Sequence, residues 1–229
     1  MIKAILFDLD NTLIDFMTMK RKCCEAAVDA MIAAGLDVKR KTAMKVLFGL
    51  YKEYGIEHKE IFQKLLIKLK GRINYRVMAH GIVAYRKLKE SYLAPYPGAV
   101  SILMILKRKY KLAIISDAPA INAWLRLVTM DIDKFFDVVI TSADVRKNKT
   151  HAAGFKAALR MLKVKPEEAL MIGDRIQRDI KTAKKLGIKT CYARYGERCL
   201  GKKPAKKGES GADFEINDIR DLLNLKILR

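Results

Sequence analysis

The chain begins with a short apolar stretch that leads directly into two carboxylates. Residues 4–7 are all apolar, and Asp8 and Asp10 follow them at once. A short run of this kind is typical of a central strand of a parallel sheet, which is buried on both faces. The sequence therefore predicts a buried strand with both carboxylates at its carboxyl end, the edge at which open α/β sheets bind ligands.

Helical periodicity replaces this pattern from about residue 18 to residue 93. Four amphipathic segments follow one another without an intervening strand, and Gly35, Gly55 and Gly71 mark the stops between them. A block of this length is too long to be one crossover helix of a sheet. We therefore expect an inserted helical domain over residues 16–94, which the chain leaves through a hinge at Pro95-Tyr96-Pro97-Gly98.

Strands and helices alternate again after this hinge. That rhythm predicts an α/β fold, a doubly wound, Rossmann-like parallel sheet built from residues 1–15 and 95–229. A segment rich in Gly and Lys, residues 196–211, is expected to be a mobile loop within it. The predicted strands are 112–115, 138–140, 170–172, 188–192 and 214–216, and the predicted helices are 99–109, 121–129, 152–162, 179–186 and a closing helix from 217 or 218.

Length and composition limit the class of protein. A chain of 229 residues can bury an α/β core together with a smaller second domain. No apolar run approaches the roughly 20 residues needed to span a bilayer, and no secretory leader precedes the first strand, so we expect a cytoplasmic protein. The cysteines lack zinc-site spacing and are expected to be free, mostly buried thiols: Cys23, Cys24, Cys191 and Cys199.

The net charge of +21 is the most unusual global feature. It fits nucleic acid, an acidic membrane surface or phosphorylated substrates as partners. The basic residues are scattered, however, with one dense run of lysines between residues 202 and 207, and they show no aromatic-interleaved pattern. A solvated basic surface is therefore the favoured interpretation, and nucleic acid is compatible with the charge but not favoured.

The first strand end requires a compensating charge. Asp8 and Asp10 are one residue apart, so strand-like alternation places both side chains on the same side, where they repel. A divalent cation or a nearby lysine would relieve this repulsion. Alternatively, Asp10 and Asn11 form a turn and Thr12 is the N-cap of a helix.

Polar groups also follow three later elements. Ser116 and the backbone N–H groups around Asp117 could hold phosphate oxygens, or Ser116 could be only an N-cap. The ammonium of Lys149 could neutralise both carboxylates and a phosphate, although one lysine in so basic a chain is weak support. Asp174 and Asp179 follow the permissive Gly173 at a helix start, where Asp179 could serve only as a cap.

Together these polar motifs resemble those of the haloacid dehalogenase superfamily of phosphohydrolases. They occur in the same order as in that family, and the resemblance covers nearly the whole chain. Asp8-x-Asp10-x-Thr12 is similar to the first family motif, and the helical insertion is similar to the cap of the first subclass. The later motifs match Ser116, Lys149, and Gly173-Asp174 with Asp179. Archaeal-type members begin much like this chain, and for them glyceraldehyde 3-phosphate or phosphoglycolate is a plausible substrate.

The resemblance implies roles for these residues. Asp8 would form an aspartyl-phosphate, and Asp10 would act as general acid and then general base. Mg²⁺ would be bound by the side chains of Asp8 and Asp174 and by the backbone carbonyl of Asp10. Asp179 would bind the ion directly or through a water molecule. The groups expected to contact the phosphoryl oxygens are Thr12, Ser116, Lys149 and the backbone amides near Asn11 and Asp117.

Several alternatives follow from the same comparison. An acid at Asp10 favours a phosphatase over a dehalogenase, and Thr12 weighs against a sugar phosphomutase. The chain departs from the family pattern at Ala118, where glycine is usual, and at residues 149–152, which lack the two usual prolines, so that Lys147 becomes a substitute for Lys149. The other hypotheses are a phosphatase for nucleotides or nucleic-acid ends and a non-catalytic basic binding protein. Substrate and oligomeric state stay open, with Tyr54, Arg76, Tyr85 and Arg86 as unranked substrate contacts.

Overall fold

The computed structural model of the protein describes residues 1–145, 152–196, 205–206 and 208–228. They divide into two compact units, one of residues 1–16 with 93–229 and one of residues 17–92. The interpretation of these units as a core over 1–15 and 95–229 and a cap over 16–94 stays a prediction. No helix in the described ranges is long and apolar enough to span a membrane.

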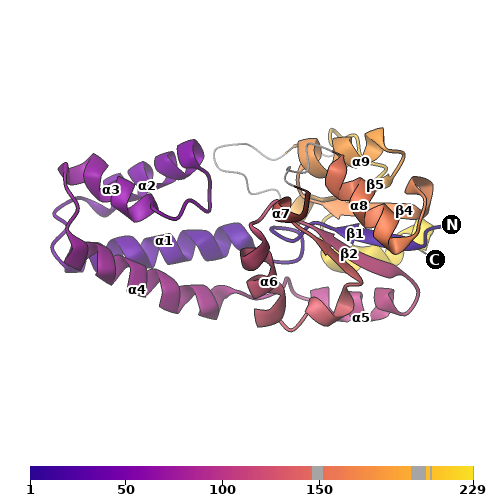
Figure 1. Ribbon diagram of the computed structural model, residues 1–229, viewed down its shortest axis with the longest axis horizontal. Coiled ribbons are helices and arrows are strands. Elements are labelled where there is room, and N and C mark those ends of the chain that lie inside the picture. Colours follow the sequence, from indigo (N-terminus) through magenta and orange to yellow (C-terminus); the bar gives the residue numbers. More distant parts are fainter. Residues whose placement is uncertain (146–151, 197–204, 207, 229) are drawn as a thin grey trace. The chain divides into compact units, whose positions relative to one another are not determined.

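The first unit contains a six-stranded parallel sheet in the order β3-β2-β1-β4-β5-β6 (Figure 1). Its central strand is β1, which pairs with β2 on one side and β4 on the other. All six strands are parallel, and the predicted α/β fold is confirmed. The strands are β1 (Ala4–Phe7), β2 (Lys111–Ile115), β3 (Val138–Ile140), β4 (Ala169–Gly173), β5 (Lys189–Ala193) and β6 (Phe214–Ile216).

Helices cover both faces of this sheet (Figure 1). Alternate residues such as Leu6 and Met171 form one buried cluster with Phe155 of α8. On the other face α5 packs against β2 and against the 3₁₀ segment η5. The longer helices of this unit are α5 (Ala99–Lys107), α6 (Ala120–Thr129) and α8 (Ala153–Leu162), and the shorter ones are α7 (Ser142–Val145), α9 (Lys181–Lys185), η1 (Asp133–Phe135), η2 (Pro166–Glu168) and η4 (Arg194–Gly196).

The strand register aligns the polar strand ends. Phe7 is paired with Ile114 of β2 and with Ile172 of β4. Residue 8 is therefore level with residues 115 and 173, and both Ser116 and Asp174 lie one residue further along. The sheet thus brings the predicted chemistry of three strands to one edge.

Two of the predicted helices differ in the structure. The closing helix is instead two 3₁₀ segments, η5 (Ile219–Asn224) and η6 (Lys226–Leu228). Its buried residues Ile219, Leu222 and Leu228 are spaced in multiples of three, which is the period of a 3₁₀ helix. The helix expected over 179–186 begins as a π-helical turn, η3 (Ile176–Ile180), before α9.

The second unit is an all-helical bundle, as expected. It contains α1 (Phe16–Ala33), α2 (Arg40–Tyr54), α3 (Ile61–Lys70) and α4 (Tyr75–Tyr92). Gly71 ends α3 in the left-handed region, with φ at 70°, and its N–H donates to the Ile67 carbonyl. Cys23 and Cys24 are buried free thiols here, as is Cys191 in β5, and burial raises the pKa of Cys24 to about 11; Cys199 lies outside the described residues.

The buried face of α4 differs from the pattern expected for its sequence. The hydrophobic positions Met78, Ile82 and Tyr85 are only partly buried, whereas Val77 and Gly81 are fully buried. A Cβ at Gly81 would overlap the side chain of Met31. The absence of a side chain at Gly81 therefore lets α4 approach α1 along this face.

Candidate active site

Asp8 lies at the carboxyl end of β1 and is only 6% exposed. Its N–H donates to the Ile172 carbonyl, which continues the β1–β4 ladder by one residue, and its Oδ2 accepts a hydrogen bond of 3.1 Å from Thr12 Oγ1. The chain reverses at Asn11, whose φ of 64° is left-handed, and the N–H of Asn11 donates to the Ile14 carbonyl. The tight turn therefore aims Thr12 back at the Asp8 carboxylate.

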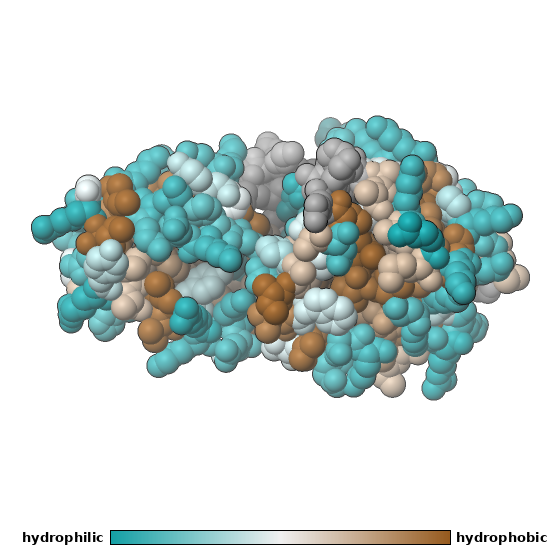
Figure 2. All heavy atoms as spheres, viewed as in Figure 1, coloured by the Kyte–Doolittle hydropathy of each residue, from teal (hydrophilic) through white to brown (hydrophobic). Residues whose placement is uncertain are grey.

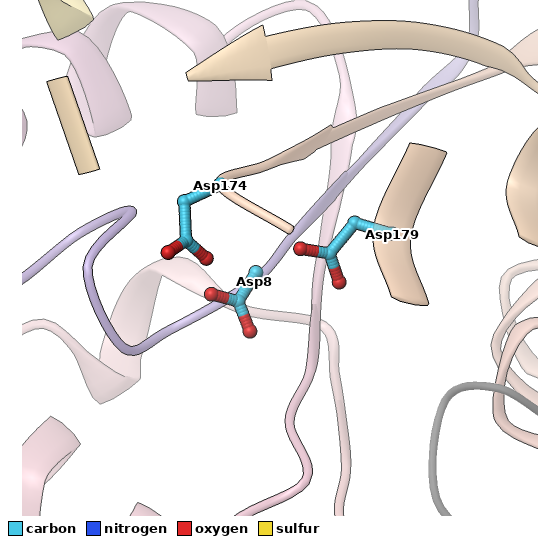
Figure 3. Close-up of side chains that lie close together, drawn as sticks. All are labelled: Asp8, Asp174 and Asp179. Atoms are coloured by element: carbon cyan, nitrogen blue, oxygen red, sulfur yellow. The ribbon is translucent and has the colours of Figure 1, made fainter. Parts of the chain in front are cut away.

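Asp174 and Asp179 complete a buried acidic cluster with Asp8, as Figure 3 shows. Asp174 follows β4 directly and is 1% exposed, and Asp179 lies on the π-helical turn and is fully buried. Asp179 Oδ2 accepts the N–H of Arg175 at 2.9 Å. A Cβ at Gly173 would lie 2.5 Å from the Asp179 carboxyl carbon. Only glycine at position 173 lets the Asp179 carboxylate rest against the end of β4.

The three carboxylates fit a small divalent cation. One oxygen from each of Asp8, Asp174 and Asp179 lies within 4.8 Å of the others. Oxygens on opposite sides of one Mg²⁺ are about 4 Å apart, so the cluster needs little movement to hold an ion. Three buried negative charges at this spacing repel one another, and a cation is the usual compensation. The site is therefore a candidate metal centre.

Ser116 and Asp117 follow β2 at the same edge. The Ser116 N–H donates to the Ile140 carbonyl, and its Oγ accepts the N–H of Ala118 at 3.2 Å. The Asp117 carboxylate accepts a hydrogen bond of 2.8 Å from Arg178 Nη1. The backbone N–H groups of Asn11 and Ala118 thus donate to the Ile14 carbonyl and to Ser116 Oγ. The Asp117 side chain links the loop after β2 to the π-helical turn.

The third predicted motif, around Lys149, lies outside the described residues. Lys149, its substitute Lys147 and the neighbouring His151 all belong to residues 146–151, which the structure does not describe. Their expected contact with phosphate stays a prediction. The helix that follows them, α8, is the element whose Phe155 and Ala158 pack on the sheet.

The Asp10 carboxylate does not belong to the acidic cluster of side chains. Its Oδ2 instead accepts a hydrogen bond of 2.6 Å from Nη1 of Arg126, a side chain that is only 3% exposed. The Arg126 guanidinium also lies 4.5 Å from the ring of Phe16. Sequence reasoning missed Arg126, because one arginine within an apolar helix carries no local signal of a buried role.

Two further residues support the turn that follows β1, and sequence reasoning missed them as well. The Tyr195 hydroxyl donates a hydrogen bond of 2.8 Å to the Thr12 carbonyl, and burial raises the pKa of Tyr195 well above its ordinary value. A Cβ at Gly196 would overlap the Asn11 carbonyl and would lie 2.9 Å from Asp174 Cβ. The signal available in the sequence was a Tyr-Gly pair that begins three residues after the end of a predicted strand, at the edge where the other motifs gather.

Three of the residues predicted as unranked substrate contacts have structural partners within the helical unit: Tyr54, Arg76 and Tyr85. Arg76 donates to the Ala34 carbonyl, and the exposed ring of Tyr54 contacts Lys64. The Tyr85 hydroxyl accepts a hydrogen bond of 2.9 Å from Lys20, a buried lysine that sequence reasoning missed. None of these contacts ranks one residue above another as a substrate ligand.

Comparison with known proteins agrees with this geometry. The family model of haloacid dehalogenase-like hydrolases matches residues 5–193. The chain is 39% identical to the glyceraldehyde 3-phosphate phosphatase of Pyrococcus furiosus, over 98% of this chain and 92% of that protein. It is 35% identical to the enzyme of the same name from Methanocaldococcus jannaschii, over 98% and 97%.

A solved structure shows the same fold. The magnesium-bound HAD-hydrolase YfnB of Bacillus subtilis superposes with a TM-score of 0.72 at 21% identity, over 100% of this chain and 99% of that one. The aligned region includes every described site residue. From the matched family model and the named relatives, the chain belongs to the haloacid dehalogenase-like hydrolases and, among them, to the enzymes that hydrolyse phosphoric monoesters.

Proposed function

We propose that this protein is a Mg²⁺-dependent phosphatase for a small phosphorylated metabolite of the sugar phosphate or phosphoglycolate type, with glyceraldehyde 3-phosphate as the first candidate. The buried cluster of Asp8, Asp174 and Asp179, next to Thr12 and Ser116 at one sheet edge, carries the proposal. The substrate class is supported by relatives named glyceraldehyde 3-phosphate phosphatases that align along nearly the whole chain.

The first step transfers the phosphoryl group to Asp8. A carboxylate oxygen of Asp8 attacks phosphorus while the bond from phosphorus to the ester oxygen breaks. The departing alkoxide takes a proton from the Asp10 carboxyl group, because an alkoxide is a poor leaving group without one. Thr12 holds Asp8 through the 3.1 Å hydrogen bond to its Oδ2, and we expect the Ser116 hydroxyl, whose Oγ accepts the Ala118 N–H, to donate to a phosphoryl oxygen.

The second step regenerates the enzyme. Asp10, now a carboxylate, accepts a proton from water, whose oxygen attacks phosphorus as the bond from phosphorus to Asp8 breaks. Inorganic phosphate leaves, and Asp8 is again a carboxylate. The same carboxyl group therefore acts first as acid and then as base, so its position relative to the phosphoryl group matters in both steps.

Mg²⁺ would be held by the side chains of Asp8, Asp174 and Asp179 together with the backbone carbonyl of Asp10. When bound, it would neutralise the buried carboxylates and the phosphoryl oxygens, so that the Asp8 carboxylate and the phosphate group of the substrate can approach each other. Asp179 is fixed for this task by the Arg175 N–H and by the lack of a side chain at Gly173. Expected phosphoryl contacts of Lys149 lie outside the described residues.

The test is phosphate release from a panel of phosphate esters, with and without Mg²⁺, by wild type and Asp8→Asn. The panel contains glyceraldehyde 3-phosphate, phosphoglycolate, a hexose phosphate, a nucleoside monophosphate and a 5′-phosphorylated oligonucleotide. We expect Mg²⁺-dependent turnover of the small esters that falls by about 10³-fold or more in Asp8→Asn, as loss of a nucleophile does.

The matched control is Asp131→Asn, which makes the same substitution at an exposed aspartate paired with Lys134. It should retain wild-type turnover. A preference for the nucleotide or the oligonucleotide would assign the substrate to that alternative class. A folded wild type that releases no phosphate from any ester would contradict the proposal and favour a binding role for this basic chain.

A further inference from the structure

Helix α6 is built with its charged residue inside and its large apolar residues outside. Arg126 is the only charged residue of α6, and it is buried on the face that also contains Ala123 and Leu127. The apolar patch seen where α6 lies (Figures 1 and 2) corresponds to exposed side chains at helical spacing, namely Ile121, Trp124, Leu125 and Val128.

This orientation opposes the hydrophobic effect. Turning α6 about its axis would bury the apolar stripe and return the guanidinium to water, although it would also expose Ala123 and Leu127. A buried charge is tolerated only with a partner of opposite charge and good geometry. Arg126 is therefore buried beside Ala123 and Leu127 together with partners that compensate its charge.

Those interactions fix the guanidinium at two points. Nη1 donates to Asp10 Oδ2 at 2.6 Å, and Cζ lies 4.5 Å from the ring of Phe16, which is 5% exposed. The contact with the ring restricts the movement of the guanidinium and so supports the direction of its N–H groups. The carboxylate that accepts from such a donor is fixed in turn.

The turn holds the backbone of Asp10, and Arg126 is a partner of its side chain. Asp10 forms a bridge with Ile14, and the left-handed Asn11 follows it. Two side-chain torsions of Asp10 would still let the carboxylate rotate. Arg126 holds Oδ2 and so sets the direction of the second oxygen, Oδ1.

On the basis of the proposed function, we infer that Arg126 is the positioning residue for the general acid and base Asp10. It acts through Asp10 and touches neither the phosphoryl group nor the metal centre. Its loss should slow only the steps in which Asp10 transfers a proton. Attack by Asp8 on an ester whose leaving group needs no proton should be unaffected.

Two substrates separate this role from a structural one. Glyceraldehyde 3-phosphate has an alkoxide leaving group that must be protonated, whereas p-nitrophenyl phosphate releases a stable phenolate. The experiment measures the first-turnover rate of each ester by rapid mixing, with Mg²⁺ present, for wild type and Arg126→Met. The first-turnover rate of the variant with the alkyl ester should be about 10- to 100-fold lower than that of wild type. Its burst of nitrophenol from p-nitrophenyl phosphate should equal that of wild type.

Rescue and coupling experiments extend the test. Arg126→Lys keeps the charge but lacks the planar guanidinium, so its rate with the alkyl ester should lie between those of wild type and Arg126→Met. Added guanidinium should restore part of the rate with the alkyl ester to Arg126→Ala. In the background of Asp10→Asn, Arg126→Met should cause no additional loss. Arg220→Met removes the same charge from an exposed ion pair with Asp218 and should behave as wild type.

The outcomes distinguish the two proposals. Equal losses with both esters, or no loss with either, would overturn the positioning role, as would an additional loss in the Asp10→Asn background. If Arg126→Met does not fold, Phe16→Leu keeps the arginine without its stacking partner and should show the same selective loss to a smaller degree. A wild type without Asp8-dependent turnover would overturn the proposed function and this role with it.

Discussion

At the scale of single residues, the sequence reveals charges at strand ends but not the groups that hold them. The positions of Asp8 and Asp174 were predictable because each lies at the end of an apolar run that is typical of a strand. Arg126 was not, because its helix is otherwise without charge and its partner Asp10 lies 116 residues away in the sequence. Functional sites are where such local rules are expected to fail.

Gly173 offers a test of the metal centre that leaves every carboxylate in place. In Gly173→Ala the new Cβ would lie 2.5 Å from the Asp179 carboxyl carbon, so Asp179 must move away from the cluster. We expect the apparent affinity for Mg²⁺ to fall by about 10- to 100-fold, as it does when a group that orients a metal site is disturbed. The measurement is phosphatase rate against Mg²⁺ concentration.

The matched control for this prediction is Gly154→Ala. A Cβ at Gly154 in α8 would lie 3.4 Å from Ile115 and 3.6 Å from Ile140, which is ordinary contact. Its Mg²⁺ dependence should equal that of wild type. An unchanged Mg²⁺ dependence in Gly173→Ala would show that Asp179 does not contribute to binding the ion.

At the scale of elements, strands and long helices followed from periodicity, but the short terminal turns did not. The six strands are found where apolar runs predicted them. The segment after Asp218 is rich in leucine and was expected to be an α-helix, yet its buried residues Ile219, Leu222 and Leu228 are three and six positions apart. The π-helical turn at Ile176–Ile180 is equally invisible in sequence, because it is imposed by the position of Asp179 against Gly173.

The cap of the closing 3₁₀ segment gives a prediction for pH. Two hydrogen bonds from the Arg220 guanidinium, and one from its backbone N–H, hold the pKa of the Asp218 carboxyl at about 2, below its ordinary 3.8. A pKa lowered by folding stabilises the protein above the unfolded value, and this contribution is lost as the pH falls towards the folded value. It should therefore be constant near neutrality and decline from about pH 4 to pH 2.

The measurement is the free energy of unfolding of wild type and Asp218→Asn from pH 6 to pH 2. Asparagine is also a good N-cap but does not titrate in this range. The wild type should be the more stable protein at pH 6, and the difference should shrink as Asp218 is protonated. A difference that stays the same at every pH would mean that the pairing with Arg220 does not favour the ionised carboxyl.

At the scale of the whole molecule, the family followed from the order of its motifs rather than from composition. Each motif alone fits an ordinary cap or turn, whereas four in sequence at successive strand ends leave few other folds. The net charge of +21 was less informative, because it does not say where on the structure the charges lie. Within the described residues the most deeply buried charged cluster is acidic, and it gathers three carboxylates at the sheet edge.

Removal of the metal should therefore destabilise the whole molecule. Scattered surface cations are screened by water and salt, so they do little to relieve repulsion among Asp8, Asp174 and Asp179. A ligand that binds only the folded chain stabilises it by about 2.7 kcal/mol at 100 times its dissociation constant. For a chain of this size we expect Mg²⁺ to raise the Tm of the metal-free protein by about 5 to 10 °C.

Asp174→Asn distinguishes a bound ion from a general effect of salt. The substitution removes one of three repelling charges, so the metal-free variant should melt at a higher temperature than metal-free wild type. It also removes a ligand, so Mg²⁺ should raise its Tm by much less, while Asp131→Asn should keep the full increase. An equal rise in all three proteins would indicate binding elsewhere on the surface. A metal-free Asp174→Asn that melts below wild type would show that the three carboxylates are compensated by the chain itself.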